Sequence, residues 1–556
     1  MAALAIAAIA AGVYATALGN GFVWDDRLIL EKQLHVFSGP LAPFFPPDVP
    51  QASDFYYRPL VTVTYLVDQA LGGRRPFPFH LTPVLLHAVA SGLVCLLFVH
   101  VLGPRAWLPA LAGALVFAVH PVHAEVVAWM AGRAESLATI GVVGALLAWG
   151  AWLETRHSGR LVGGAAALFC GLLGKETALA GVPLAATLPW VWPHARDRRA
   201  GRPLCVVLAI TVIAYVGLRT VALGTGPGFA RTVPLAETAR GVAGALGFYA
   251  MQLVWPRATA PVLTSAPIDT PHVVVGILAT LGFVAAVALA LYRRATRAAW
   301  GLLWIGAGLV APLVLVVRAI SETPIADRYL YGPSAGAAFL IAVGIAGLPA
   351  RRIRIGAGAV ALAVVVAGVV SARRSLVWRD NLVFWQNAVA AAPDEGFALM
   401  KLGLELGERG DRAGAEARYR EALGARLSPW QRAVVANNLG HLLLAQRRCP
   451  EAEPLFRAAV ATGPRFAGPY RGLAECLMMR VPASDRDALR EIRGLLENAL
   501  RFEPTAARSA LLLAQTHLAE GNRGEAVRWF TRAVDVAPDS PSAARAREAL
   551  ATLERP

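Results

Sequence analysis

The chain has 556 residues, of which 56% are hydrophobic and only 16% are charged, and its formal net charge is +16. Soluble globular domains carry about 25% charged residues, so this composition argues against an ordinary soluble protein. The positive charge does not indicate a nucleic-acid partner, because much of it lies in short loops between apolar blocks, where membrane topology is encoded. Nearly all of it is arginine, which, with the abundant Ala and Gly, is typical of a GC-rich bacterial genome.

Apolar blocks recur from Met1 to about Ser371, and most approach the roughly 20 residues that span a bilayer. The residues 1–372 are therefore predicted to form a polytopic helical membrane domain, and 373–556 a separate soluble part. We expect membrane segments near 1–18, 81–102, 107–120, 137–153, 161–173, 178–192, 204–223, 272–292, 299–317, 330–348 and 353–371.

Arginine clusters set the predicted topology. They fall at Arg156 to Arg160, Arg196 to Arg202, Arg293 to Arg297 and Arg351 to Arg354. Alternation of about 11 crossings places all four clusters on the cytoplasmic side, as the positive-inside rule requires, if the block at 241–256 is re-entrant or interfacial. If that block crosses, the count becomes about 12 and the C-terminal part moves inside.

A long first extracytoplasmic loop is predicted over 19–80. It opens with Trp24, Asp25 and Asp26, two carboxylates directly after a membrane segment, and it contains Arg58 and ends at His80. Acidic residues at membrane depth are costly and usually functional. The alternative is a helix boundary with an interfacial tryptophan and solvated acids, and His80 as a buried, hydrogen-bonded imidazole.

The second predicted loop is dense in polar residues. His120 and His123 are three residues apart on one helix face, Glu125 follows, and Arg133 and Glu135 come next. A metal site is the obvious alternative, but the spacing is not the His-Glu-x-x-His of zinc hydrolases.

Two further polar stretches interrupt the apolar blocks. Lys175 and Glu176 resemble the tail of a phosphate-binding loop, but the glycine spacing upstream is missing. Arg328 and Tyr331 lie where a membrane helix meets the external interface, so Arg328 is either a functional cation or an interfacial anchor.

The C-terminal part repeats a pattern of small residues, large apolar residues and a closing proline, which is typical of tetratricopeptide repeats (TPRs). Four repeats are predicted, the third with a short insertion, preceded by a lone second helix with Trp385, Ala388 and Pro393. Their signatures include Gly403 with Tyr419, Gly440 with Phe456, Ala474 with Ala499, and Ala514 with Phe530. The predicted fold class is thus all-α, a membrane helical domain followed by a TPR solenoid.

Taken in order, these stretches resemble one family, the transmembrane and tetratricopeptide-repeat proteins of the C-type glycosyltransferase superfamily. The resemblance covers nearly the whole chain and is weakest from about 200 to 300. It is carried by Trp24-Asp25-Asp26, Tyr57-Arg58-Pro59-Leu60, Phe79-His80-Leu81, His87, His120-Pro-Val-His123, Glu125, Gly132-Arg133, Glu135, Lys175-Glu176, Arg328, Tyr331 and the repeats.

The resemblance implies transfer of a sugar, typically mannose, from a polyprenyl-phosphate carrier to protein hydroxyls on the extracytoplasmic side. It implies a base in the first loop, Asp25 or Asp26, which at an ordinary pKa of about 4 would be ionised. Arg328, Lys175 and Arg133 are the candidates for the donor phosphate, since Arg can grip it with two parallel bonds. Sugar or acceptor positioning is expected of Arg58, His80, His120, His123, Glu125, Glu135, Glu176 and Tyr331.

Several alternatives stay open at this point. The acidic pair could bind a divalent metal, although no resident metal or other cofactor is expected with certainty. The chain could be a non-catalytic TPR scaffold for envelope assembly, an enzyme resembling O-antigen ligases, or a transporter. The array is short for the family. The composition predicts a bacterial origin, with the protein in the inner membrane and the repeats outside the cytoplasm. The donor sugar and the acceptor can therefore differ from those of the eukaryotic members.

Overall fold

The computed structural model describes residues 1–34, 37, 39, 41–45, 56–193, 195, 201–224, 234–256, 263, 267–318, 323–482 and 484–554. Parts of the predicted first loop, of the Arg196 to Arg202 cluster and of the loop before Arg328 lie outside these residues. The chain divides into two compact units, Met1–Asn387 and Ala388–Pro556. The boundary between the two units lies 15 residues after the predicted domain boundary at residue 372, and it falls inside a helix.

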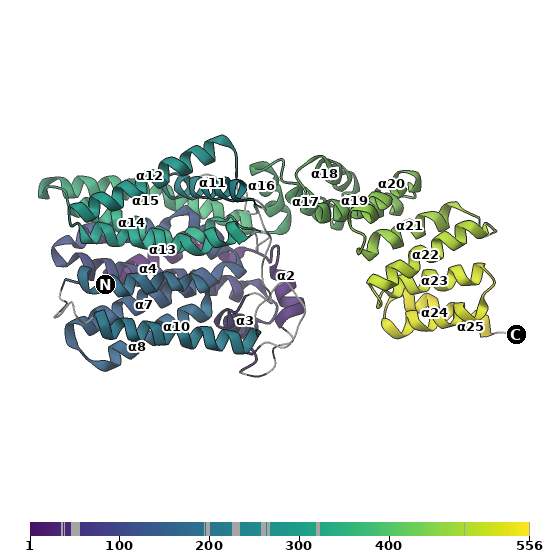
Figure 1. Cartoon of the computed structure of the whole chain (residues 1–556), viewed down its shortest axis with the longest axis horizontal. Coiled ribbons are helices and arrows are strands. Elements are labelled where there is room, and N and C mark those ends of the chain that lie inside the picture. Colours follow the sequence, from purple (N-terminus) through teal and green to yellow (C-terminus); the bar gives the residue numbers. More distant parts are fainter. Residues whose placement is uncertain are drawn as a thin grey trace. The chain divides into compact units, whose positions relative to one another are not determined.

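Both units are built from α-helices (Figure 1), and the described residues contain no strand beyond two isolated bridges. The all-α prediction is confirmed. The first unit contains α1 (Ala2–Val13), α2 (Asp26–Leu28), α3 (Pro59–Gly72), α4 (Pro76–Leu102), α5 (Trp107–Val119), α6 (Ala124–Ala128), α7 (Ala134–Thr155), α8 (Ser158–Gly174), α9 (Gly181–Val191), α10 (Gly201–Leu223), α11 (Leu235–Val254), α12 (Thr270–Tyr292), α13 (Thr296–Arg318), α14 (Tyr331–Ala346), α15 (Ala350–Ser375) and the start of α16 (Asn381–Ala391).

In the described part of this unit, seven helices are long and apolar enough to cross a membrane, or eight if the bent pair Pro104–Val119 and Pro121–Ala128 is one span. The predicted segments at 1–18, 161–173 and 178–192 correspond to shorter helices, α1, α8 and α9, of 12, 17 and 11 residues. The block at 241–256 forms most of α11, which is not among the candidate spans.

The candidate spans differ in how much protein covers them. Those containing α4, α7 and α14 are 61%, 72% and 61% buried, whereas those of α12 and α15 are only 11% and 17% buried. The covered helices pack closely through small residues: a Cβ on Gly141 of α7 would lie 2.4 Å from Gly171 of α8. Such contacts let helix backbones approach in a membrane. The polar motifs lie at the ends of the covered helices, where fixed elements can hold them.

Short 3-10 turns break the helices where the polar motifs occur. They are Pro121–His123, Met130–Arg133, Glu176–Ala180 and Asp327–Leu330. Each turn redirects the chain at the end of a helix, and most of the side chains in the turns Pro121–His123, Met130–Arg133 and Asp327–Leu330 are buried in the bundle. One helix, α3, was not predicted; it lies within the first loop and begins at Pro59, which suits a first helical position.

The second unit stacks helical hairpins (Figure 1). The pairs are α17 (Gly396–Glu408) with α18 (Arg412–Gly424), α19 (Pro429–Ala445) with α20 (Cys449–Thr462), α21 (Ala467–Arg480) with α22 (Arg486–Phe502), and α23 (Ala507–Ala519) with α24 (Arg523–Val536), followed by α25 (Pro541–Glu554).

The repeat signatures have a direct steric reason. A Cβ on Gly403 would lie 2.8 Å from the Tyr419 ring, and one on Gly440 would lie 2.7 Å from the Phe456 ring. In these two hairpins the glycine on the first helix therefore makes room for the aromatic ring of the second. The four predicted hairpins are present, and α25, which sequence reasoning did not predict, buries Ala546 in the same apolar core.

Candidate functional site

The first-loop acidic pair lies in a tight turn directly after the first helix. The backbone N–H of Val23 donates to the Asp26 carboxylate (3.0 Å), and the N–H of Asp26 donates to the Val23 carbonyl (3.1 Å). Trp24, inside this turn, has a positive φ of 53°, which costs about 1 kcal/mol or more in a residue other than glycine. Such strain persists only where surrounding contacts fix it, and it points the two adjacent carboxylates in a set direction.

Asp26 is fully buried, whereas Asp25 is partly exposed. Burial, helped by the neighbouring charge of Asp25, raises the pKa of Asp26 to about 8, although the N–H of Val23 opposes the shift. The expectation of an ordinary pKa is therefore wrong for Asp26. A carboxyl of this kind is half ionised near the pH at which a general base works best.

An aromatic stack covers the turn. The Trp24 indole lies nearly parallel to that of Trp129, with ring centroids 5.1 Å apart, and Trp129 stacks in turn on Trp378 at 5.5 Å. The Trp24 ring also contacts Phe384 and Trp385. These rings exclude water from one side of the acidic pair.

Arg328 also contacts Trp129, with its guanidinium carbon 5.6 Å from a Trp129 ring centroid. Its side chain pairs with Glu125, whose other carboxylate oxygen accepts the backbone N–H of Arg328 at 3.0 Å. It also donates to the hydroxyls of Thr323 and Tyr329 at 2.7 and 3.1 Å. Arg328 and Glu125 are 9% and 5% exposed, so they form a buried, fixed pair and not a snorkelling interfacial contact.

Tyr329 connects Arg328 to Lys175. Its ring centroid is 4.7 Å from the Arg328 guanidinium carbon and 5.1 Å from the Lys175 ammonium nitrogen. Lys175 pairs with Glu135 at 2.6 Å, and the second oxygen of Glu135 accepts from the Thr177 hydroxyl at 2.9 Å. Two cations therefore lie on one tyrosine ring, each held by its own carboxylate.

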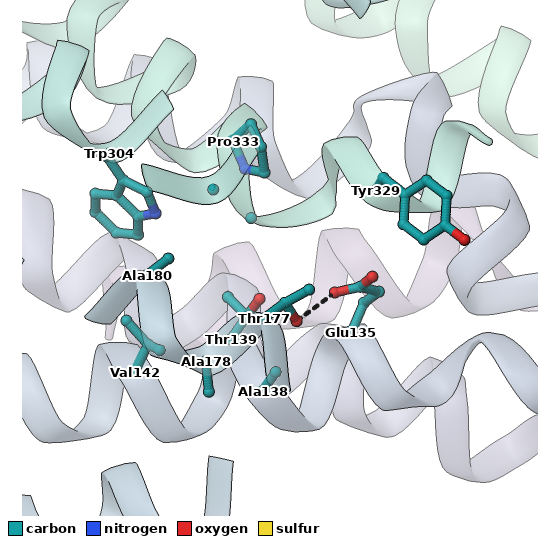
Figure 2. A pocket seen from close by; sticks show the side chains of 12 residues that line it. Glu135, Ala138, Thr139, Val142, Thr177, Ala178, Ala180, Trp304, Tyr329 and Pro333 are labelled. Carbon is teal, nitrogen blue, oxygen red and sulfur yellow. Dashed lines mark hydrogen bonds between the residues drawn. The ribbon is translucent and has the colours of Figure 1, made fainter. Parts of the chain in front are cut away.

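A small cavity of about 30 Å³ opens beside this group (Figure 2). Figure 2 shows Glu135 and Thr177 joined by a hydrogen bond at one end, with Tyr329 across from them and Trp304 and Pro333 farther along. The remaining lining is mostly apolar: Ala138, Val142, Ala178, Ala180, Gly308 and Gly332, with Thr139. The cavity thus has a charged end and an apolar end.

A third ion pair lies nearer the surface. Arg58 pairs with Glu176 at 3.1 Å, and its guanidinium also lies 4.3 Å from the ring of Tyr56. Burial opposes ionisation of Glu176, but the charges of Arg58 and Lys175 outweigh it and lower the pKa of Glu176 to about 2. Glu176 is therefore ionised at any working pH.

Arg133 is placed differently from the other two candidate cations. Its guanidinium is fully buried and pairs with Asp68 of α3, and it also donates to Met130, Thr64 and the Phe79 carbonyl. This network ties α3 and the start of α4 to the turn before α7, so Arg133 holds the first loop onto the bundle.

The predicted histidines lie in a ring-packed cluster within the bundle. His123 Nε2–H donates to Ser334, His120 Nε2–H donates to the Leu253 carbonyl, and the Tyr331 hydroxyl bonds to His87 at 2.8 Å. The ring centroids of His123 and Tyr331 are 4.5 Å apart. His80 lies apart from this cluster and bonds through Nε2 to the Gly21 carbonyl, which supports the first-loop turn.

The structure thus brings the acidic pair, Arg328 and Lys175 together through Trp129 and Tyr329. Sequence reasoning missed both of these rings, and also Asp68 and Thr177. Tyr329 and Thr177 stand next to the predicted residues Arg328 and Glu176, whereas no local pattern marks Trp129 or Asp68. Within the described residues, no group of three or more His, Cys, Asp or Glu side chains is arranged to hold a metal ion.

Comparisons with known proteins agree with both halves of this description. A tetratricopeptide-repeat family model matches residues 432–463, which are α19 and α20. Protein O-mannosyl-transferase Tmtc1 of Drosophila melanogaster is 32% identical over 197 residues, covering 34% of this chain and 23% of the relative. Tmtc2 of the same organism is 33% identical over 37% of this chain and 24% of its own, and mouse TMTC3 is 35% identical over 26% and 16%.

The predicted family resemblance is confirmed. The chain matches less than a quarter of the length of each of these relatives. A crystal structure of YrrB, a TPR protein with an unusual peptide-binding site, aligns with 30% of this chain and 81% of its own at 20% identity, with a TM-score of 0.25. The chain is therefore a TPR-containing membrane protein similar to the TMTC proteins.

Proposed function

We propose that the protein is a membrane glycosyltransferase that moves a sugar, mannose in the first instance, from a polyprenyl-phosphate carrier to a protein hydroxyl. The observation that carries the proposal is the grouping of a buried first-loop carboxylate with two buried cations around Trp129 and Tyr329. The relatives' names supply the reaction class, because each is called a protein O-mannosyl-transferase.

The chemistry needs a base at one end and a cation at the other. The ionised Asp26, or Asp25 beside it, accepts the proton of the acceptor hydroxyl. The hydroxyl oxygen attacks the anomeric carbon at the same time, from the face opposite the phosphate. The bond from that carbon to the phosphate oxygen breaks, its electron pair stays on the phosphate, and the anomeric configuration inverts. Arg328 and Lys175 stabilise the negative charge that grows on the leaving phosphate.

The carboxylates that hold these cations in place are part of the arrangement. Glu125 fixes the guanidinium of Arg328, and Glu135 fixes the ammonium of Lys175, so neither cation has to be ordered when the donor binds. A buried cation without a carboxylate would be strongly destabilising in the absence of donor.

We further propose that the protein lies in a bacterial inner membrane with the acidic pair and the TPR array outside the cytoplasm, where the array binds protein or peptide acceptors. The alternating arginine clusters support this orientation. A single cysteine introduced near Asp539, in a variant without the five native cysteines, should react with an impermeant reagent in intact spheroplasts. Reaction only after lysis would place the array inside.

The test of the activity is reconstitution of the purified full chain in liposomes with polyprenyl-phosphate mannose and co-expressed envelope proteins. Intact-mass analysis should show added hexose in the presence of wild-type protein and none with Asp25→Asn/Asp26→Asn. If wild type adds no hexose from this or any other polyprenyl-phosphate sugar, the scaffold interpretation becomes the better one.

A further inference from the structure

We propose that Asn381 and Trp24 are positioning residues for the first-loop acidic pair, so that the segment leading into the TPR array holds the base in place. This inference rests on the proposed function for its catalytic part. It is carried by contacts that join residues 20–24 to residues 375–385, which are more than 350 positions away in the sequence.

Three hydrogen bonds make the junction. The side-chain amide of Asn20 donates to the Ser375 carbonyl (3.1 Å), the N–H of Gly21 donates to the Arg379 carbonyl (2.8 Å), and the N–H of Trp24 donates to the side-chain oxygen of Asn381 (2.9 Å). The approach is close, because a Cβ on Gly21 would lie 3.3 Å from the Arg379 carbonyl oxygen.

Asn381 is placed for this contact and not for capping its own helix. Asn is favoured as an N-cap, where its side chain satisfies a helix N–H. In α16 that part is taken by Asp380, whose carboxylate accepts the N–H of Val383 at 3.0 Å. The Asn381 side chain therefore contacts the first loop, where its oxygen accepts the backbone N–H of the strained residue Trp24.

The strain at Trp24 needs this support. The backbone of Trp24, with its φ of 53°, would relax to a negative φ unless surrounding contacts held the residue in place. The bond from Asn381 holds the backbone, while Trp129, Phe384 and Trp385 hold the ring. Asp25 and Asp26 follow immediately, so a relaxed Trp24 would turn both carboxylates away from their present direction.

Asn387 provides a matched control on the same helix. It is exposed, and its side chain donates only to the Val383 carbonyl four residues earlier. We compare Asn381→Leu with Asn387→Leu, and add Asn381→Asp, which keeps the acceptor oxygen. Three quantities are measured on the full chain in liposomes: amide hydrogen exchange of residues 20–28, the single-turnover rate of hexose transfer at saturating donor, and the KM for the donor from steady-state rates.

Asn381→Leu should speed exchange at the turn about tenfold, the expected effect of one lost hydrogen bond. It should slow transfer about 100-fold, as expected for a misplaced catalytic group, with the KM for the donor unchanged. Asn381→Asp should restore most of the rate, and Asn387→Leu should match wild type in both measurements.

Other results overturn the inference. If Asn381→Leu exchanges faster but transfers hexose at the wild-type rate, the junction has only a structural role. If its amide exchange is unchanged, Asn381 does not hold the turn. If Asn387→Leu loses as much transfer activity as Asn381→Leu, the cause is general destabilisation. Trp24→Gly gives a second route if Asn381→Leu does not fold, because glycine accepts the positive φ while the ring is lost; a wild-type rate there also overturns it. If wild type itself transfers nothing, the proposed function fails, and exchange alone still shows whether Asn381 fixes the turn.

Discussion

In the membrane unit the pairs Arg133–Asp68, Lys175–Glu135 and Arg328–Glu125 join residues far apart in the chain and are nearly closed to solvent, whereas many pairs in the array join residues one helical turn apart and have an exposed arginine. Arg133 and Asp68 are 0% and 1% exposed, but Arg457, which pairs with Glu453 one helical turn away, is 51% exposed. The first kind of pair fixes tertiary geometry, since a lone partner left buried is costly. The second kind contributes mainly to solubility and adds little to stability.

The largest effect is expected where a buried acid is also the proposed base. Asp26→Asn keeps the shape but cannot accept a proton, so transfer should fall about 100- to 10,000-fold without loss of folded protein. Single-turnover assays of Asp25→Asn and Asp26→Asn separately will show which carboxylate acts. Near-full turnover in both variants would place the base elsewhere.

Breaking the most buried pair should show in stability. Asp68→Ala or Arg133→Ala should each lower the free energy of unfolding by about 3–5 kcal/mol, because each leaves one charge buried and unpaired. The double variant Asp68→Leu/Arg133→Met should recover much of that loss. Reversible unfolding in mixed micelles measures this, and additive single losses in the double variant would argue against a coupled pair.

Arg328 tests whether buried geometry or charge alone matters. Arg328→Ala should lose about 100- to 1,000-fold in the chemical step, as for removal of one donor to developing charge. Arg328→Lys should lose at least about tenfold, because an ammonium cannot reproduce the planar fork that contacts Glu125, Thr323 and Tyr329. Equal rates for Arg and Lys would make Arg328 an anchor and move the phosphate role to Lys175.

The pH dependence distinguishes the two first-loop acids. Only an ionised carboxylate can accept the proton, and the pKa of Asp26 is raised to about 8 by burial. If Asp26 is the base, kcat/KM should rise with pH from about 6 to about 9 and level off above that range. A profile that is already flat at about pH 6 would exclude Asp26 as the base.

The smallest effect is expected in the array. Arg457→Ala removes contacts to Glu453 and Glu491, yet the unfolding free energy should change by less than about 1 kcal/mol. Denaturant unfolding of the full chain, followed through the array's helical signal, provides the measurement. A loss comparable to that of Arg133→Ala would remove the contrast between the two units.

Sequence reasoning succeeded where the relevant pattern is local. A small residue on the first helix, such as Gly403 or Ala514, recurs in each repeat because each hairpin has the same packing problem, so the array could be predicted. The polar motifs of the membrane unit could be located for a related reason: a charge between apolar blocks is conspicuous.

Pairings and burial could not be predicted in the same way. Nothing near Asp68 signals that it meets Arg133, since the pair depends on how α3 lies against the bundle. The raised pKa of Asp26 follows mainly from its burial in the folded unit, which the residues around it in the sequence do not signal. Residue pairings and burial of this kind depend on the tertiary fold, so no residue spacing within a short segment encodes them.

The Arg133–Asp68 pair also has an evolutionary consequence. With both side chains fully buried, a lineage that loses one charge passes through a state in which the other is buried alone. Substitutions at the two positions should therefore occur together among homologues, either both charged or both uncharged. Exposed positions of the array such as Arg457 and Glu491, which meet in solvent, should change independently, so the surface of the array can diversify around an unchanged membrane unit.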